Sequence, residues 1–76
     1  MTQCKLDHSL DDVVSKLLTQ RIYLPEHLFN GLHAYLGPEV RQSELNEIFH
    51  LLKKYDLSSD NIRSEREDRL YKIIDK

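Results

Sequence analysis

The dipeptide Gly37-Pro38 constrains the fold of this chain more than any other feature of its sequence. Glycine is favoured just past the end of a helix, because it accepts a left-handed backbone without a Cβ clash. Proline is favoured at the first helical position, where its missing N–H leaves no bond unmade. Apolar residues at helical spacing lie on both sides of the pair. The chain is therefore expected to turn a tight corner here, with one helix ending at Leu36 and the next beginning at Pro38.

Apolar residues recur at the i, i+3, i+4 and i+7 spacing of a helix face in several segments, and no segment alternates as a strand would. The predicted helices span residues 9–22, 25–36, 38–55 and 59–75. Ser9 is expected to cap the first helix and Pro25 to open the second. The last helix begins either at Ser59 or at Ser64, which forms a capping box with Glu67. We expect an all-α fold, a small antiparallel bundle of three to four helices.

The second predicted helix contains Gly31, at a cost of about 1 kcal/mol in helix propensity relative to alanine. Its expected use is the close approach of a neighbouring helix. Residues 1–8 show no helical period and are expected to form a flexible leader, which leaves residues 9–76 as a single helical domain.

The length of 76 residues predicts a thin core. A domain of this size rarely gains more than about 3–5 kcal/mol from its hydrophobic core without a further staple. The single cysteine, Cys4, excludes an internal disulfide and suits a reducing compartment. We therefore expect self-association, with a homodimer as the simplest form.

The charge balance and the absence of long apolar runs restrict partner and location. The net charge is −2 and the pI is near 6.0, so the basic excess of a typical nucleic-acid binder is absent. No run of the sequence resembles a signal peptide or is long enough to span a membrane. The expected location is the cytoplasm, with no membrane partner.

No residue cluster has the pattern of a catalytic or metal site. Glu44, Glu47 and His50 have metal-ligand spacing on one helix, but they lie away from the core stripe and read as a solvated face. Cys4 and His8 supply two zinc ligands where a structural site needs four. Two glycines are too few for a phosphate-cradling loop. We expect no enzyme activity, no cofactor and no metal.

The third predicted helix has a wider apolar face than one packing neighbour needs. Val40 and Leu51 fall together on its flank, and Tyr55 lies at its end. Arg41 and Arg66 fall within apolar stripes, where a guanidinium could bind a partner's carboxylate. These five residues are the predicted partner-binding set of a non-catalytic protein-interaction module, an adaptor or a regulator.

The alternative function is DNA binding by a helix-turn-helix, since two helices joined by a short corner outline that motif. The helix after the corner would then enter the major groove, with Arg41, Gln42 and Asn46 reading bases. Glu39, Glu44 and Glu47 on the same helix would face phosphates, which costs affinity. A DNA partner is therefore the less favoured prediction.

Overall fold

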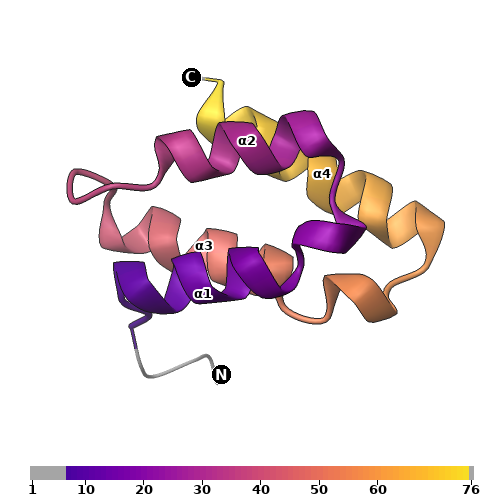
Figure 1. Ribbon diagram of the computed structural model, residues 1–76, viewed down its shortest axis with the longest axis horizontal. Coiled ribbons are helices and arrows are strands. Elements are labelled where there is room, and N and C mark those ends of the chain that lie inside the picture. Colours follow the sequence, from indigo (N-terminus) through magenta and orange to yellow (C-terminus); the bar gives the residue numbers. More distant parts are fainter. Residues whose placement is uncertain (1–6, 76) are drawn as a thin grey trace.

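The structure, a computed structural model, describes residues 7–75. In that range it contains four α-helices and two short 3₁₀ turns (Figure 1). The helices are α1 (Leu10–Thr19), α2 (Glu26–Tyr35), α3 (Gln42–Leu52) and α4 (Asp60–Ile74). The 3₁₀ turns are η1 (Arg21–Tyr23) and η2 (Tyr55–Leu57). The predicted all-α class is confirmed.

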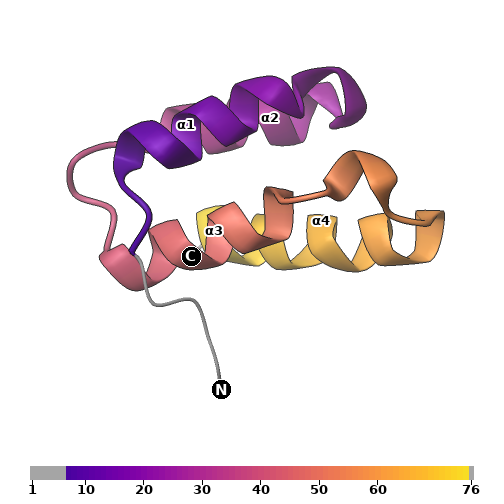
Figure 2. The ribbon, with the colours of Figure 1, turned by 90° about the horizontal axis from the view of Figure 1, so that it is seen from below.

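The helices form two layers, α1 beside α2 and α3 beside α4 (Figure 2). Across the layers, α1 packs on α3 and α2 packs on α4. Consecutive helices run in opposite directions, so the bundle is antiparallel as predicted (Figure 1). Both views place η1, η2 and the start of α4 toward one end of the molecule, and the connection between α2 and α3 at the other. Among the described residues, no helix has the length and apolar character that a membrane crossing requires.

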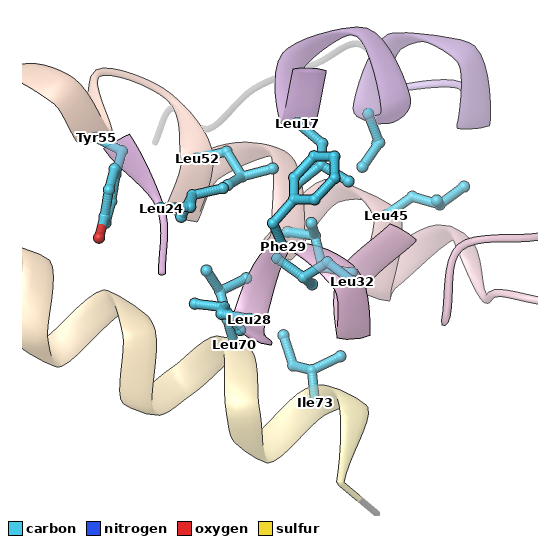
Figure 3. Packing of buried hydrophobic residues seen from close by; sticks show 12 residues of the cluster. Leu17, Leu24, Leu28, Phe29, Leu32, Leu45, Leu52, Tyr55, Leu70 and Ile73 are labelled. Carbon is cyan, nitrogen blue, oxygen red and sulfur yellow. The ribbon is translucent and has the colours of Figure 1, made fainter. Parts of the chain in front are cut away.

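The described apolar side chains form a core cluster between the two layers (Figure 3). Its buried members are Val13, Leu17, Leu24, Leu28, Phe29, Leu32, Leu45, Ile48, Leu52, Tyr55, Leu70 and Ile73. Each fully buried leucine or isoleucine contributes about 1.5–3 kcal/mol relative to an exposed one. The core therefore draws on all four helices, and no helix is stable without its neighbours.

Three of the four helix starts follow the predicted signals. The Ser9 side chain accepts a hydrogen bond from the backbone N–H of Asp12 (3.0 Å), so Ser9 caps α1. Pro25 immediately precedes α2. The Ser59 side chain accepts from the N–H of Ile62 (3.4 Å), which settles the start of α4 in favour of Ser59 over Ser64.

The first helix ends earlier than predicted. Instead of continuing to Ile22, α1 stops at Thr19 and the chain tightens into η1. Leu24 must leave the helical region because it precedes Pro25, and it adopts an extended backbone (φ −90°, ψ 147°). Since a 3₁₀ turn advances by about 120° per residue, the apolar stripe of α1 is not continued. Ile22 is consequently 82% exposed, and Leu24 takes the core position.

The corner at Gly37-Pro38 is longer than predicted. α2 ends at Tyr35 and α3 begins at Gln42, not at Pro38. Leu36 leaves the helix in an extended conformation (φ −71°, ψ 125°), and Gly37 has no positive φ. The N–H of Val40 then donates to the Gly37 carbonyl (3.1 Å), which closes a separate turn. The predicted left-handed glycine cap is therefore wrong.

The third helix also ends earlier than predicted, at Leu52 instead of Tyr55. Lys54 adopts the left-handed conformation (φ 58°), the usual geometry just past a helix end, although it is not a glycine. This reversal starts η2 and points Tyr55 into the core.

Gly31 serves the close approach that the sequence predicts. It lies in α2, opposite the end of α4. A Cβ built on Gly31 would meet Cδ1 of Ile74 at 2.8 Å, closer than real contacts allow. The end of the Ile74 side chain thus occupies the space that a side chain at position 31 would need.

Candidate protein-interaction surface

Tyr55, one of the five predicted partner-binding residues, is fully buried (0% exposed). Its hydroxyl donates a hydrogen bond to the carboxylate of Glu67 on α4. Burial, together with this bond and the negative charge of Glu67, raises the pKa of Tyr55 well above its usual range. Its side chain is thus part of the core and out of a partner's reach in this conformation.

Arg66 is engaged within the chain. Its Nη1 donates to the backbone carbonyls of Leu51 (3.2 Å) and Lys53 (2.6 Å), groups that the end of α3 leaves without helical partners. One turn earlier on α4, Arg63 Nε donates to the Tyr55 carbonyl (3.2 Å). Both arginines therefore hold α4 against the end of α3 and the segment that follows it. This role accounts for the presence of Arg66 in an otherwise apolar stripe.

Of the three other predicted residues, Val40 and Arg41 are neighbours at the corner before α3, whereas Leu51 lies near the far end of that helix. Val40 and Leu51 are half-buried and pack against the core, so the predicted surplus flank of the third helix is largely covered by the chain itself. Arg41 is exposed and lines an open hollow of about 700 Å³ at the corner between α2 and α3. The structure thus does not bring the five residues together into one surface, and their role in partner binding stays a prediction.

The exposed large apolar side chains among the described residues lie toward the opposite end of the molecule. They are Leu18 (50% exposed), Ile22 (82%), Tyr23 (43%), Leu57 (76%) and Ile62 (41%). Ile22 and Tyr23 belong to η1, Leu57 to η2 and Ile62 to the first turn of α4, elements that both ribbon views place toward one end; Leu18 belongs to the last turn of α1, which leads into η1. Single exposed apolar residues are ordinary in a folded protein, so what sets these five apart is that their elements lie near one another. We call these five residues the apolar end.

Two hydrogen bonds between Gln20 and Asp56 join η1 to η2 within the apolar end. Gln20, which is only 6% exposed, donates from Nε2 to Oδ1 of Asp56 (3.1 Å) and accepts at Oε1 from the Asp56 backbone N–H (3.1 Å). Gln20 directly precedes η1 and Asp56 lies in η2, so these two hydrogen bonds hold η1 against η2. The fold of the single chain therefore determines how η1 and η2 lie relative to each other.

Charged side chains of both signs surround the apolar end. Arg21 is exposed and places its guanidinium 4.9 Å from the centre of the Phe29 ring. Lys54, before η2, is also exposed, as is Asp60 at the start of α4. These charged residues are chain neighbours of the apolar end, and we call them its polar rim.

The amides proposed as base readers are held by the residues that precede α1. Gln42 Nε2 donates to the carbonyl of His8 (2.6 Å) and to Oδ1 of Asn46 (3.0 Å). Asn46 in turn accepts from the backbone N–H of His8 (2.9 Å) and donates to Asp7 (3.2 Å). The ring of His8 stacks on Phe49 at 3.7 Å between centroids. Residues 7 and 8 therefore cover this face of α3.

The residues whose spacing suggested a metal site are not gathered around a common point in the described part of the chain. The Glu44 carboxylate accepts a hydrogen bond from the Tyr35 hydroxyl (2.8 Å). Cys4 lies outside the described residues, so its pairing with His8 has no structural counterpart to describe. In the range 7–75, no group of three or more histidine, cysteine, aspartate and glutamate side chains is placed to hold a metal ion.

Two members of the apolar end had signals in the sequence that periodicity did not use. Leu57 is the lone apolar residue of the stretch Asp56-Leu57-Ser58-Ser59-Asp60, and such a residue in a polar turn has little core to enter. Ile22 lies within three residues of Pro25, where a helix must already be ending.

Comparison of the chain with protein-family models, with curated proteins and with solved structures finds no match to any of them.

Proposed function

We propose that this chain is a small, non-catalytic protein-interaction module, an adaptor or regulator that acts by binding a protein through the apolar end. The observation that supports the proposal is the gathering of Leu18, Ile22, Tyr23, Leu57 and Ile62 toward one end. Covering such a surface removes apolar area from water, which is the main driving force of protein association. The proposal also places the protein in the cytoplasm, since its one cysteine suits a reducing compartment.

DNA binding is the alternative proposal, and the geometry favours it less. A helix-turn-helix joins its helices by three or four residues, whereas six residues separate Tyr35 from Gln42. Gln42 and Asn46, which would read bases, are bonded to residues 7 and 8. A gel-shift series on mixed DNA fragments at low salt separates the two proposals, because retardation there would favour DNA over protein as the partner.

The direct test captures binding proteins from an extract of the source cells on the immobilised chain. Ile22→Glu and Leu57→Glu each place a charge on the apolar end, so both should lose what the native chain retains. Ala34→Glu is the matched control, because Ala34 is an exposed apolar residue near the far end of α2. It should retain the same proteins as the native chain.

Far-UV circular dichroism of all three variants shows whether they are folded. Because Ile22 and Leu57 are mostly exposed, neither substitution should reduce the helix content. Equal retention by the native chain and by both variants of the apolar end would contradict the proposal.

A further inference from the structure

We infer that the apolar end of this chain is covered by the apolar end of a second copy, which makes the protein a twofold dimer. The inference rests on the proposed function, because it names the occupant of the same surface.

The exposed apolar area fits such a dimer. From their exposed fractions, the side chains of the apolar end present roughly 500 Å² on each copy. Complete burial of this area on both copies would cover roughly 1,000 Å² before the polar rim is counted, which is about the minimum for a specific interface. Ile22 and Leu57, the most exposed of the five, gain most from being covered.

The charges around the apolar end favour a copy of the same chain over a strongly charged partner. In a twofold contact a surface meets itself, so favourable pairing requires both signs of charge on one copy. The rim provides both signs, because Arg21 and Lys54 are positively charged and Asp60 is negatively charged. The net charge of −2 also leaves little repulsion between two copies.

The apolar end is organised before association. The two hydrogen bonds between Gln20 and Asp56 already fix η1 against η2 in the single chain. Association therefore has few groups left to order, which lowers its entropic cost. A contact of modest area can then hold two copies together.

Sedimentation equilibrium from about 10 µM to about 1 mM tests the inference. The native chain should change from monomer to dimer within this range. Ile22→Glu and Leu57→Glu should each raise the dissociation constant at least about tenfold, and Ala34→Glu should leave it unchanged. A native chain that stays monomeric throughout, or a dimer that both variants of the apolar end leave intact, would overturn the inference.

Cysteine cross-linking gives an independent reading that does not depend on introduced charge. In a Cys4→Ser background, which removes the one natural thiol, Ile22→Cys and Leu57→Cys place single thiols on the apolar end. At least one of them should form a disulfide-linked dimer on mild oxidation, because a twofold axis through the apolar end brings the equivalent residues nearest the axis into contact. Ala34→Cys is the control and should stay monomeric; cross-linking there alone contradicts the inference.

The two proposals fail in different ways. A monomeric native chain that still captures a cellular protein through Ile22 and Leu57 would overturn the dimer and leave the interaction module standing. A native chain that neither dimerises nor captures a protein through these residues would overturn both.

Discussion

Tyr55 shows how one side chain can leave a predicted surface and become part of the core. Its hydroxyl is buried against Glu67, and its pKa is raised because burial and the nearby carboxylate disfavour the phenolate. Below about pH 10, the tyrosine is protonated in the folded and in the unfolded chain. Above it, the unfolded chain releases the proton while the folded chain keeps it. This tyrosine therefore makes the free energy of unfolding fall as the pH rises beyond about 10.

Tyr55→Phe should remove this alkaline contribution. At neutral pH, the variant should lose about 1 kcal/mol, because Glu67 is only half-buried and can turn to water. Between about pH 9 and about pH 11, its free energy of unfolding should fall less steeply than that of the native chain. Urea denaturation across this range measures both effects. Tyr23→Phe, which removes an exposed hydroxyl, is the control; an unchanged alkaline slope in Tyr55→Phe would refute the assignment.

Gly37 gives the residue-scale test of the corner. The sequence predicted a left-handed cap there, and alanine at such a position destabilises a fold. In the structure, Gly37 has no positive φ, and no heavy atom beyond its chain neighbours lies within 4 Å of a Cβ built on it. Gly37→Ala should therefore stabilise the protein by about 0.4–1 kcal/mol, through the lower entropy of its unfolded chain. A lower urea midpoint in this variant would instead support a left-handed backbone at Gly37.

At the scale of the elements, Gly31 and Ile74 are expected to be energetically coupled across α2 and α4. Gly31→Ala gains about 1 kcal/mol of helix propensity, but its Cβ forces Cδ1 of Ile74 to move. Ile74→Val removes that carbon. In the valine background, the alanine should stabilise the fold by close to the full propensity gain, and in the native background by clearly less. A double-mutant cycle measured by urea denaturation should show a coupling of at least about 0.5 kcal/mol, and strict additivity would contradict the contact.

The pair formed by Gln20 and Asp56 is the element-scale feature on which the apolar end depends. Gln20→Ala leaves the Asp56 N–H without its partner and should cost about 1–2 kcal/mol. Gln20→Glu keeps the shape but sets two carboxylates against each other where the amide donates now, so it should cost more at neutral pH. Relative to the native chain, its loss should shrink below about pH 4, where a shared proton restores the bond. A pH-independent loss would exclude this explanation.

The helices were largely predictable from sequence; the exceptions were the start of the third helix and the C-terminal ends of the first and the third. Ser9, Pro25 and Ser59 mark helix starts through local chemistry, which periodicity and capping rules describe. The ends at Thr19 and Leu52 depend on contacts far along the chain. Gln20 turns inward because Asp56 lies opposite it, and Arg66 holds the last carbonyls of α3 from α4. Such contacts have no local signal in the sequence.

At the scale of the whole molecule, the same nonlocal contacts explain why the candidate surface was not found from sequence. A helical wheel over residues 9–22 places Leu18 and Ile22 in the apolar stripe of one long helix. The tight η1 leaves Ile22 exposed, and η2 does the same for Leu57, whereas Leu18 is half-exposed within α1 itself. Val40 and Leu51, which seemed surplus on a wheel, are used by the core. The conformation of the segments that connect the helices therefore determines which apolar residues of a small bundle stay exposed.

If two copies share their apolar ends, the thermal stability of the protein should depend on its concentration. Association withdraws folded monomers from the unfolding equilibrium, so a higher concentration favours the folded state. For a chain of 76 residues, each kcal/mol gained raises the midpoint by about 4–8 °C. Between about 10 µM and about 1 mM, the native chain should therefore gain several degrees. Leu57→Glu should gain clearly less over this range, while Ala34→Glu should follow the native chain; a native midpoint that does not move with concentration would show that the folded copies do not associate.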